Sequence, residues 1–87
     1  MVTIEQLRKQ LKQIDANIIE NLAQRQGVST KIGQLKQEIG KEIIDLTQEK
    51  ILFEFHENLA EKYQLQQEFI KRLFRVVIAY SRMVQQP

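Results

Sequence analysis

The stretch that decides the fold runs from Ile4 to Ile39, IEQLRKQLKQIDANIIENLAQRQGVSTKIGQLKQEI. Its apolar residues recur at alternating steps of three and four, beginning with Ile4, Leu7, Leu11, Ile14 and Ile18. This spacing is typical of a helix that packs along one seam. The pattern shifts at Leu22 and then continues through Val28, Ile32, Leu35 and Ile39. The stretch therefore predicts a single long helix.

The ends of this helix carry their own signals. Thr3 and Gln6 have the spacing of a capping box, and Gly40 suits the position just after a helix. Gly27 and Gly33 have no turn residues beside them, so we expect the helix to run through both. Its length is then about 36 residues, or ~54 Å. The alternative is a break at Gly27, which would give a monomeric three-helix bundle.

Two shorter helices are expected after the long one. Asp45 can cap the second helix, with Gln48 three residues later, and its buried face would hold Ile51, Leu52, Phe55, Leu59 and Tyr63. Residues 63–66 would form the link to the third helix, whose apolar face would hold Phe69, Leu73, Phe74, Val77, Tyr80 and Val84. No stretch has the pattern of a strand. The expected fold is all-α, with three helices in one domain of residues 1–87.

The lengths of the helices bear on the oligomeric state. Two helices of about 20 residues reach ~30 Å each and cannot cover an apolar seam of ~54 Å. The overhang needs a second chain to bury it. We therefore expect an intertwined homodimer in which the two long helices run antiparallel across a twofold axis.

Composition narrows the classes of function. Hydrophobic residues make up 43% and charged residues 28%, as in a globular domain, and the net charge is only +2. Acids and bases alternate, so we expect no nucleic-acid partner. There is no cysteine and only one histidine, His56, so we expect no metal site. No run of ~20 apolar residues and no signal peptide is present, which predicts a cytoplasmic protein without a membrane partner.

Some polar residues fall where packing does not explain them. Arg25 and Lys36 are three helical turns apart, on one face and ~16 Å from each other, which fits either an anion site or two solvated charges. Arg8 lies too far along the helix to join them in its own chain. If two such helices cross antiparallel near residue 20, Arg8 of one chain falls beside residues 30–32 of the other, between those two cations.

Two further pairs have the i, i+4 spacing of one helix face. Asp45 and Glu49 fit a helix start, with an N-cap and a first-turn acid. Ser81 and Gln85 fit a solvated last turn of the third helix. From the residues alone, neither pair requires a function.

Together these residues resemble a known family, the all-helical chorismate mutases. The resemblance covers nearly the whole chain in order, through Leu7 to Asp15, Leu22 to Arg25, Lys31 to Lys36, Asp45 with Glu49, Phe69 to Phe74, and Ser81 to Gln86. It implies a homodimer with two shared sites that converts chorismate into prephenate by a pericyclic rearrangement. It also implies that no cofactor is needed.

The resemblance implies a role for each matched residue. Arg25 and the partner chain's Arg8 would bind the two carboxylates of the substrate, and Ser81 would assist with one of them. Lys36 would serve a carboxylate and the ether oxygen, to which Gln85 would also donate. Glu49 and the backbone of Asp45 would hold the ring hydroxyl.

One position departs from the family pattern. Gln48 stands where the family usually has an arginine, so the site has one cation fewer. This keeps open two related activities of the same fold, the elimination of pyruvate from isochorismate and a mutase acting on 4-amino-4-deoxychorismate. A third interpretation, of another class, is a helical dimer that serves as an interaction module without catalysis.

Overall fold

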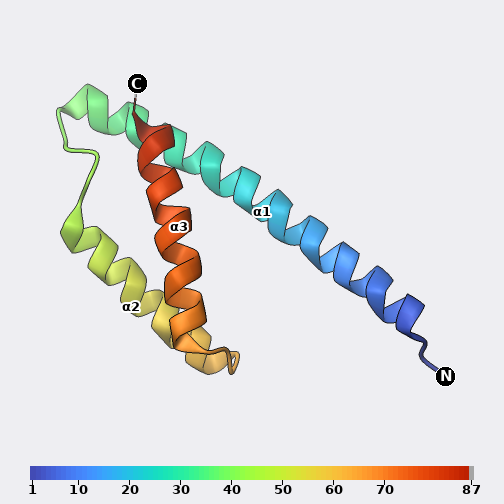
Figure 1. The fold of residues 1–87 in the computed structure, drawn as a ribbon. Coiled ribbons are helices and arrows are strands. Elements are labelled where there is room, and N and C mark those ends of the chain that lie inside the picture. The colour runs from blue at the N-terminus through green and yellow to red at the C-terminus, as the bar shows by residue number, and fades with distance from the viewer. Residues whose placement is uncertain (87) are drawn as a thin grey trace.

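The computed structural model describes residues 1–86 as three helices (Figure 1). They are α1 (Ile4–Ile39), α2 (Leu46–Lys62) and α3 (Gln67–Gln85). Their lengths are 36, 17 and 19 residues, so the predicted arrangement of one long and two shorter helices is confirmed. None of these helices combines the length and the apolar character that a membrane-crossing segment needs.

Helix α1 is continuous, and its ends are capped as the sequence predicts. The Thr3 side chain accepts a hydrogen bond from the Gln6 backbone, and the Thr3 backbone donates to the Gln6 side chain. Gly40 ends the helix in the left-handed conformation, with φ 71°, which costs glycine little. Because the helix passes through Gly27 and Gly33 without a turn, the alternative of a break at Gly27 is wrong.

The two shorter helices also begin and end near the predicted positions. The Asp45 carboxylate accepts from the Gln48 backbone at 3.0 Å and so caps α2. Residues 63–66 link α2 to α3, and Gln64 takes a positive φ of 56° within this turn. The predicted link is therefore confirmed.

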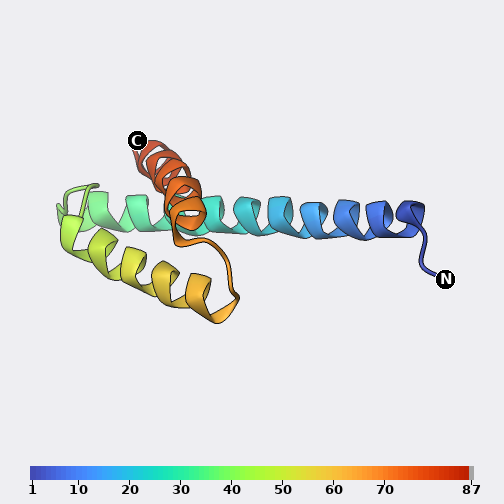
Figure 2. The same ribbon diagram turned by 60° about the horizontal axis from the view of Figure 1, so that its bottom comes forward.

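Helix α3 holds the fold together, because it packs against both α1 and α2. Figures 1 and 2 show α3 crossing the C-terminal part of α1, with α2 beside it and the N-terminal part of α1 extending away. We call residues 4–18 the projecting segment and residues 19–39 the packed segment of α1. The chain measures 59 × 24 × 15 Å, with a radius of gyration of 16.4 Å against about 12 Å for a compact chain of this length.

Little apolar surface is buried within one chain. Ala60 and Ile78 are the buried apolar residues of the described part, and Ser29, His56 and Ser81 are buried polar ones. The expected burial of Phe55 and Tyr63 on α2, and of Phe69 and Tyr80 on α3, is wrong for the single chain, since all four are at least half exposed. The small Ala60 and the flat His56 ring face α3 instead, and the bulky side chains remain outside.

Candidate active site

A cavity of about 310 Å³ lies between the packed segment of α1, the start of α2 and the end of α3. Its volume falls at the lower end of the range of small-molecule sites. The predicted site residues that line it are Arg25, Lys36, Asp45, Gln48, Glu49, Ser81 and Gln85. Ser29, Ile32, Ile43, Leu52, Ile78 and Arg82 complete the wall. Residues from three elements, up to 60 positions apart in sequence, thus meet at one place.

Arg25 occupies one end of the cavity. Its guanidinium donates to the Ser81 hydroxyl, which in turn donates to the Val77 carbonyl at 3.0 Å. Burial lowers the pKa of Arg25 from its ordinary value, yet an arginine remains protonated at neutral pH. The contact with Ser81 fixes the side chain while other N–H groups of the fork stay free for an anionic ligand.

Lys36 occupies the other end and connects three elements. Its ammonium donates to the Ile43 carbonyl at 2.6 Å, in the α1–α2 loop, and to the Gln85 side-chain oxygen at 3.1 Å. A lysine can only donate, so Gln85 must turn its oxygen toward Lys36. The Gln85 NH₂ group is then left to donate to a ligand.

Gly33 allows α3 to approach α1 at this point. A Cβ atom at Gly33 would lie 2.6 Å from the Gln85 Cα atom and 2.6 Å from its carbonyl oxygen, distances that real side chains do not tolerate. Gly33 is itself buried. The glycine therefore determines how close Gln85 comes to the packed segment of α1.

Glu49 forms an ion pair across the cavity wall. Arg82 of α3 donates to both of its carboxylate oxygens, with Nε 2.9 Å from Oε2 and Nη2 closer still to Oε1. The Glu49 side chain is 19% exposed and that of Arg82 36%. The hydrogen bonds that Arg82 donates to the Glu49 carboxylate raise the pKa of Arg82 above its ordinary value. Glu49 is thus held in one orientation beside Asp45.

Arg8 lies elsewhere in its own chain. It belongs to the projecting segment, its side chain is 67% exposed, and it pairs with Glu5 at 3.2 Å. Arg8 does not line the cavity. This placement agrees with the expectation that Arg8 cannot reach the site of its own chain.

Three residues at or near the cavity were missed by the sequence analysis as functional candidates. Arg82 pairs with a residue 33 positions away, and no local spacing reveals such a pair. Gly33 did have a signal, because a glycine inside a helix often marks a close approach of another element.

His56, which sequence reasoning gave no role beyond excluding a metal site, is buried beside the site. Its ring stacks on Phe74 with centroids 3.8 Å apart, and its Nδ1 atom has no partner among the described residues. Burial and, secondly, the charge of Arg25 lower the pKa of His56.

Comparison with known proteins identifies relatives over almost the whole chain. Residues 7–86 match the family model described as chorismate mutase type II. The chain is 36% identical over 78 residues, 90% of its length, to the bifunctional chorismate mutase/prephenate dehydratase of Buchnera aphidicola subsp. Schizaphis graminum, and covers 20% of that protein. The corresponding protein of the Acyrthosiphon pisum subspecies is 35% identical over 74 residues, 85% of the chain and 19% of the relative.

A shorter relative is matched over most of its length. The chorismate mutase of Methanocaldococcus jannaschii is 21% identical over 82 residues, which are 94% of this chain and 83% of the relative. The chain therefore spans about a fifth of the two bifunctional relatives and most of the archaeal one.

Proposed function

This chain belongs to the chorismate mutase type II family, and we propose that it converts chorismate into prephenate as an intertwined homodimer. The observation that carries the proposal is the convergence of Arg25, Lys36 and Gln85 on one cavity. The reaction breaks a C–O bond and forms a C–C bond within one molecule. It needs no proton transfer, so the residues have only to bind, orient and stabilise charge.

Binding uses the cations at the two ends of the cavity. Chorismate carries two carboxylates, and a guanidinium matches a carboxylate with two parallel hydrogen bonds. Arg25, fixed by Ser81, binds one carboxylate, and Ser81 assists there. Arg8 of the partner chain binds the other carboxylate and closes the open side. Lys36 binds the substrate at the end of the cavity opposite to Arg25.

Catalysis depends on donors aimed at the ether oxygen. Negative charge builds on this oxygen as the C–O bond breaks, so fixed donors stabilise the transition state more than the substrate. The Lys36 ammonium and the Gln85 NH₂ are these donors, and the hydrogen bond from Lys36 to the Gln85 side-chain oxygen holds both side chains in place. One such donor contributes roughly 3–4 kcal/mol in comparable oxyanion sites. Holding the two ends of the substrate together adds an orientation effect.

The ring hydroxyl is held at the start of α2. Glu49 accepts from it, and the backbone at Asp45 assists, while the Asp45 carboxylate is occupied with the helix cap. Gln48 lines the same wall with a neutral side chain. This wall therefore recognises the ring substituent.

The dimer is supported by two exposed apolar stripes of equal length. The first stripe lies on the projecting segment and consists of Ile4, Leu7, Leu11, Ile14 and Ile18. The second stripe lies on the outer side of α3 and consists of Phe69, Leu73, Val76, Tyr80 and Met83. Each stripe has heptad spacing and extends over 15 residues, about 21 Å from the first to the last. An apolar groove of about 390 Å³ between α1 and α3 continues the second stripe. We propose that the projecting segment of the partner covers this stripe and the groove that continues it.

The proposal is tested by mixing the protein with chorismate and following the loss of its absorbance. Prephenate as the product, identified by mass, would support the assignment. Isochorismate and the 4-amino analogue are offered separately, because the neutral Gln48 leaves both related activities open. A dimer that binds none of the three compounds would contradict the proposal and favour an interaction module.

The role of Gln85 has a sharper test. The Gln85→Glu variant can donate to the ether oxygen only while its carboxyl is protonated, so its activity should fall as the pH rises. The unmutated protein should keep a nearly flat rate across the same range. Gln86→Glu is the matched control, since residue 86 is the exposed neighbour outside the cavity. Equal pH profiles for the two variants would remove Gln85 from the reaction.

A further inference from the structure

We propose that Arg82, acting through Glu49, is a positioning residue that makes the site prefer a hydroxyl over an amino group on the substrate ring. The inference rests on the proposed function, because it assigns Glu49 to the ring substituent. It adds a residue that the sequence analysis did not identify. The physical basis is the two-point contact between Arg82 and Glu49 at the edge of the cavity.

The geometry of the pair fixes the carboxylate. Arg82 comes from the last turns of α3 and Glu49 from the first turn of α2, so their contact joins two elements across the site. Both nitrogens of the fork face both oxygens of Glu49, which defines the carboxylate plane. Each carboxylate oxygen has further lone pairs, so Glu49 can still accept one hydrogen bond from a ligand.

The net charge of the Arg82–Glu49 pair determines whether the site favours a ring hydroxyl or a ring ammonium group. Without Arg82, Glu49 would present a full negative charge to the ring, which attracts an ammonium group and repels the dianionic part of the substrate. With Arg82 in contact, the pair is close to neutral and its guanidinium repels an ammonium. A hydroxyl needs only the acceptor. The amine of the 4-amino analogue is an aliphatic amine and is mostly protonated at neutral pH.

The other charges around the cavity do not perform this task. Arg25 and Lys36 are both positive, and the proposed function assigns them to a carboxylate and to the ether oxygen rather than to the ring substituent. The Asp45 carboxylate accepts from the backbone of α2. A substitution of Arg82 therefore changes the net charge beside Glu49 without removing a residue that the proposed function assigns to a substrate carboxylate or to the ether oxygen.

The experiment measures kcat/KM for chorismate and for the 4-amino analogue with the same preparation of each variant. The ratio of the two values cancels any loss of folded protein, which separates specificity from a merely structural effect. The variants are Arg82→Met, Arg82→Lys and Arg82→Gln, the last in case the first does not fold. Arg72→Met is the matched control, because Arg72 is another arginine of α3 that pairs with a glutamate, Glu68, but it lies outside the cavity.

Arg82→Met and Arg82→Gln should shift the ratio about tenfold toward the amino analogue, which corresponds to ~1.4 kcal/mol. Arg82→Lys keeps the charge and should keep most of the preference, and Arg72→Met should leave the ratio unchanged. Adding Glu49→Gln to Arg82→Met should abolish the shift, because no carboxylate remains to attract the amine.

The outcomes separate the inference from the proposed function. If the unmutated protein converts chorismate but Arg82→Met and Arg82→Gln leave the ratio unchanged, the inference is wrong and the proposed function stands. A preference of the unmutated protein for the amino analogue would also overturn it. If the unmutated protein converts neither compound, the proposed function fails, and the inference fails with it.

Discussion

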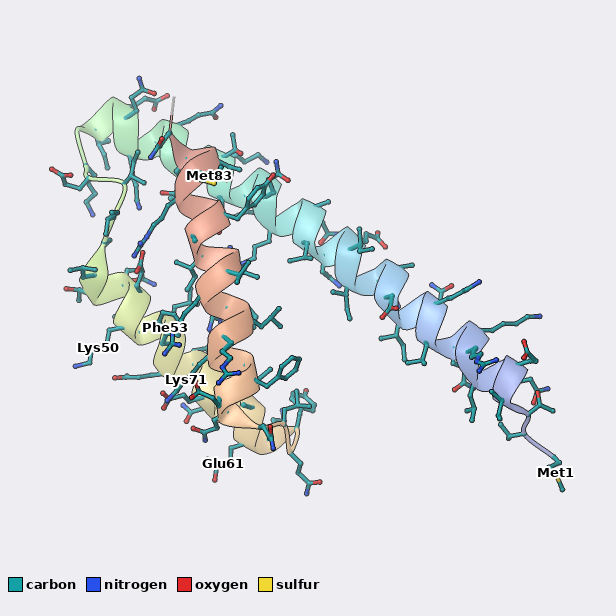
Figure 3. The ribbon with its side chains drawn as sticks, in the orientation of Figure 1. Met1, Lys50, Phe53, Glu61, Lys71 and Met83 are labelled. Carbon is teal, nitrogen blue, oxygen red and sulfur yellow. The ribbon has the colours of Figure 1, made fainter. Side chains whose placement is uncertain are left out.

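The two segments of α1 have the same apolar spacing but opposite surroundings. In the projecting segment every residue is exposed, including Leu11 at 60% and Ile14 at 53%. Figure 3 shows the side chains of this part of α1 with no other helix beside them. In the packed segment Ser29 is 5% exposed, Gly33 is buried, and Arg25 and Lys36 are half-buried against α3. One continuous helix therefore builds a cavity wall at one end and leaves an apolar stripe uncovered at the other.

The difference shows where the stabilisation of the projecting segment has to come from. Burial of one large aliphatic side chain contributes roughly 1.5–3 kcal/mol. The five large apolar residues of the stripe contribute little of this within one chain, because each keeps about half or more of its surface exposed. A second copy would bury the stripe and at the same time bring Arg8 toward the cavity. Stability and function would then depend on the same contact.

The largest expected effect comes from placing a charge in the stripe. Leu11→Glu should weaken dimerisation more than about 100-fold, or ~2.7 kcal/mol, and should abolish activity, because an unpaired carboxylate would be buried. Gln13→Glu puts the same charge on the opposite side of the helix and should leave the dimer intact. Sedimentation gives the mass, which should be twice 10.3 kDa for the unmutated protein. A fully active monomer of either form would refute the shared site.

The second largest effect is expected from removing Arg8 of the projecting segment or Arg25 of the packed segment. Arg8→Ala and Arg25→Ala homodimers should each be nearly inactive, since every site lacks one carboxylate ligand. In a mixed dimer one of the two sites has both arginines. An equal mixture should therefore regain roughly a quarter of the activity, because about half of its dimers are mixed. If mass measurement verifies subunit exchange and no activity returns, Arg8 of one chain and Arg25 of the other do not act together in one site.

The third effect tests how closely the packed segment must approach α3. Gly33→Ala should lower kcat/KM about 10- to 100-fold, because the added Cβ displaces Gln85. Gly27→Ala is the matched control, since no described atom lies within 4 Å of its Cβ position. It should leave activity unchanged and stabilise the helix by up to ~1 kcal/mol. Equal activities of the two variants would show that the approach at Gly33 is not needed.

The smallest effect concerns the buried histidine beside the packed segment. Burial and the charge of Arg25 lower the pKa of His56 in the folded chain, so the unfolded chain takes up a proton first as the pH falls. Stability from the neutral ring is present above its ordinary pKa of 6.5 and is lost below it. The free energy of unfolding should therefore fall between pH 7 and pH 5. His56→Phe keeps an aromatic ring against Phe74 and should show a weaker fall at the same protein concentration.

The local features of the fold were predictable because their causes are local. The cap at Thr3, the end at Gly40 and the continuity of α1 depend on residues within four positions of one another. The cap at Asp45 and the turn at residues 63–66 follow in the same way. The position of Arg25 and Lys36 on the same face of α1 was also predictable, since helical geometry alone determines it.

The buried faces of α2 and α3 were predicted less well. An apolar stripe indicates that a helix packs, but not against which neighbour. His56 and Ala60 face α3 in this chain, whereas Phe55 and Tyr63 remain outside. The sequence pattern alone cannot separate contacts within one chain from contacts between chains.

The amino-acid sequence alone determines three helices, the side-chain caps of the first two and a long apolar seam, because hydrogen bonds and periodicity act over a few residues. The tertiary structure decides which distant side chains meet. The Arg82–Glu49 pair, the contact of Lys36 with Gln85 and the approach at Gly33 all depend on how α3 crosses α1 and α2. That crossing is set by the packing of many side chains together, and no local spacing encodes it.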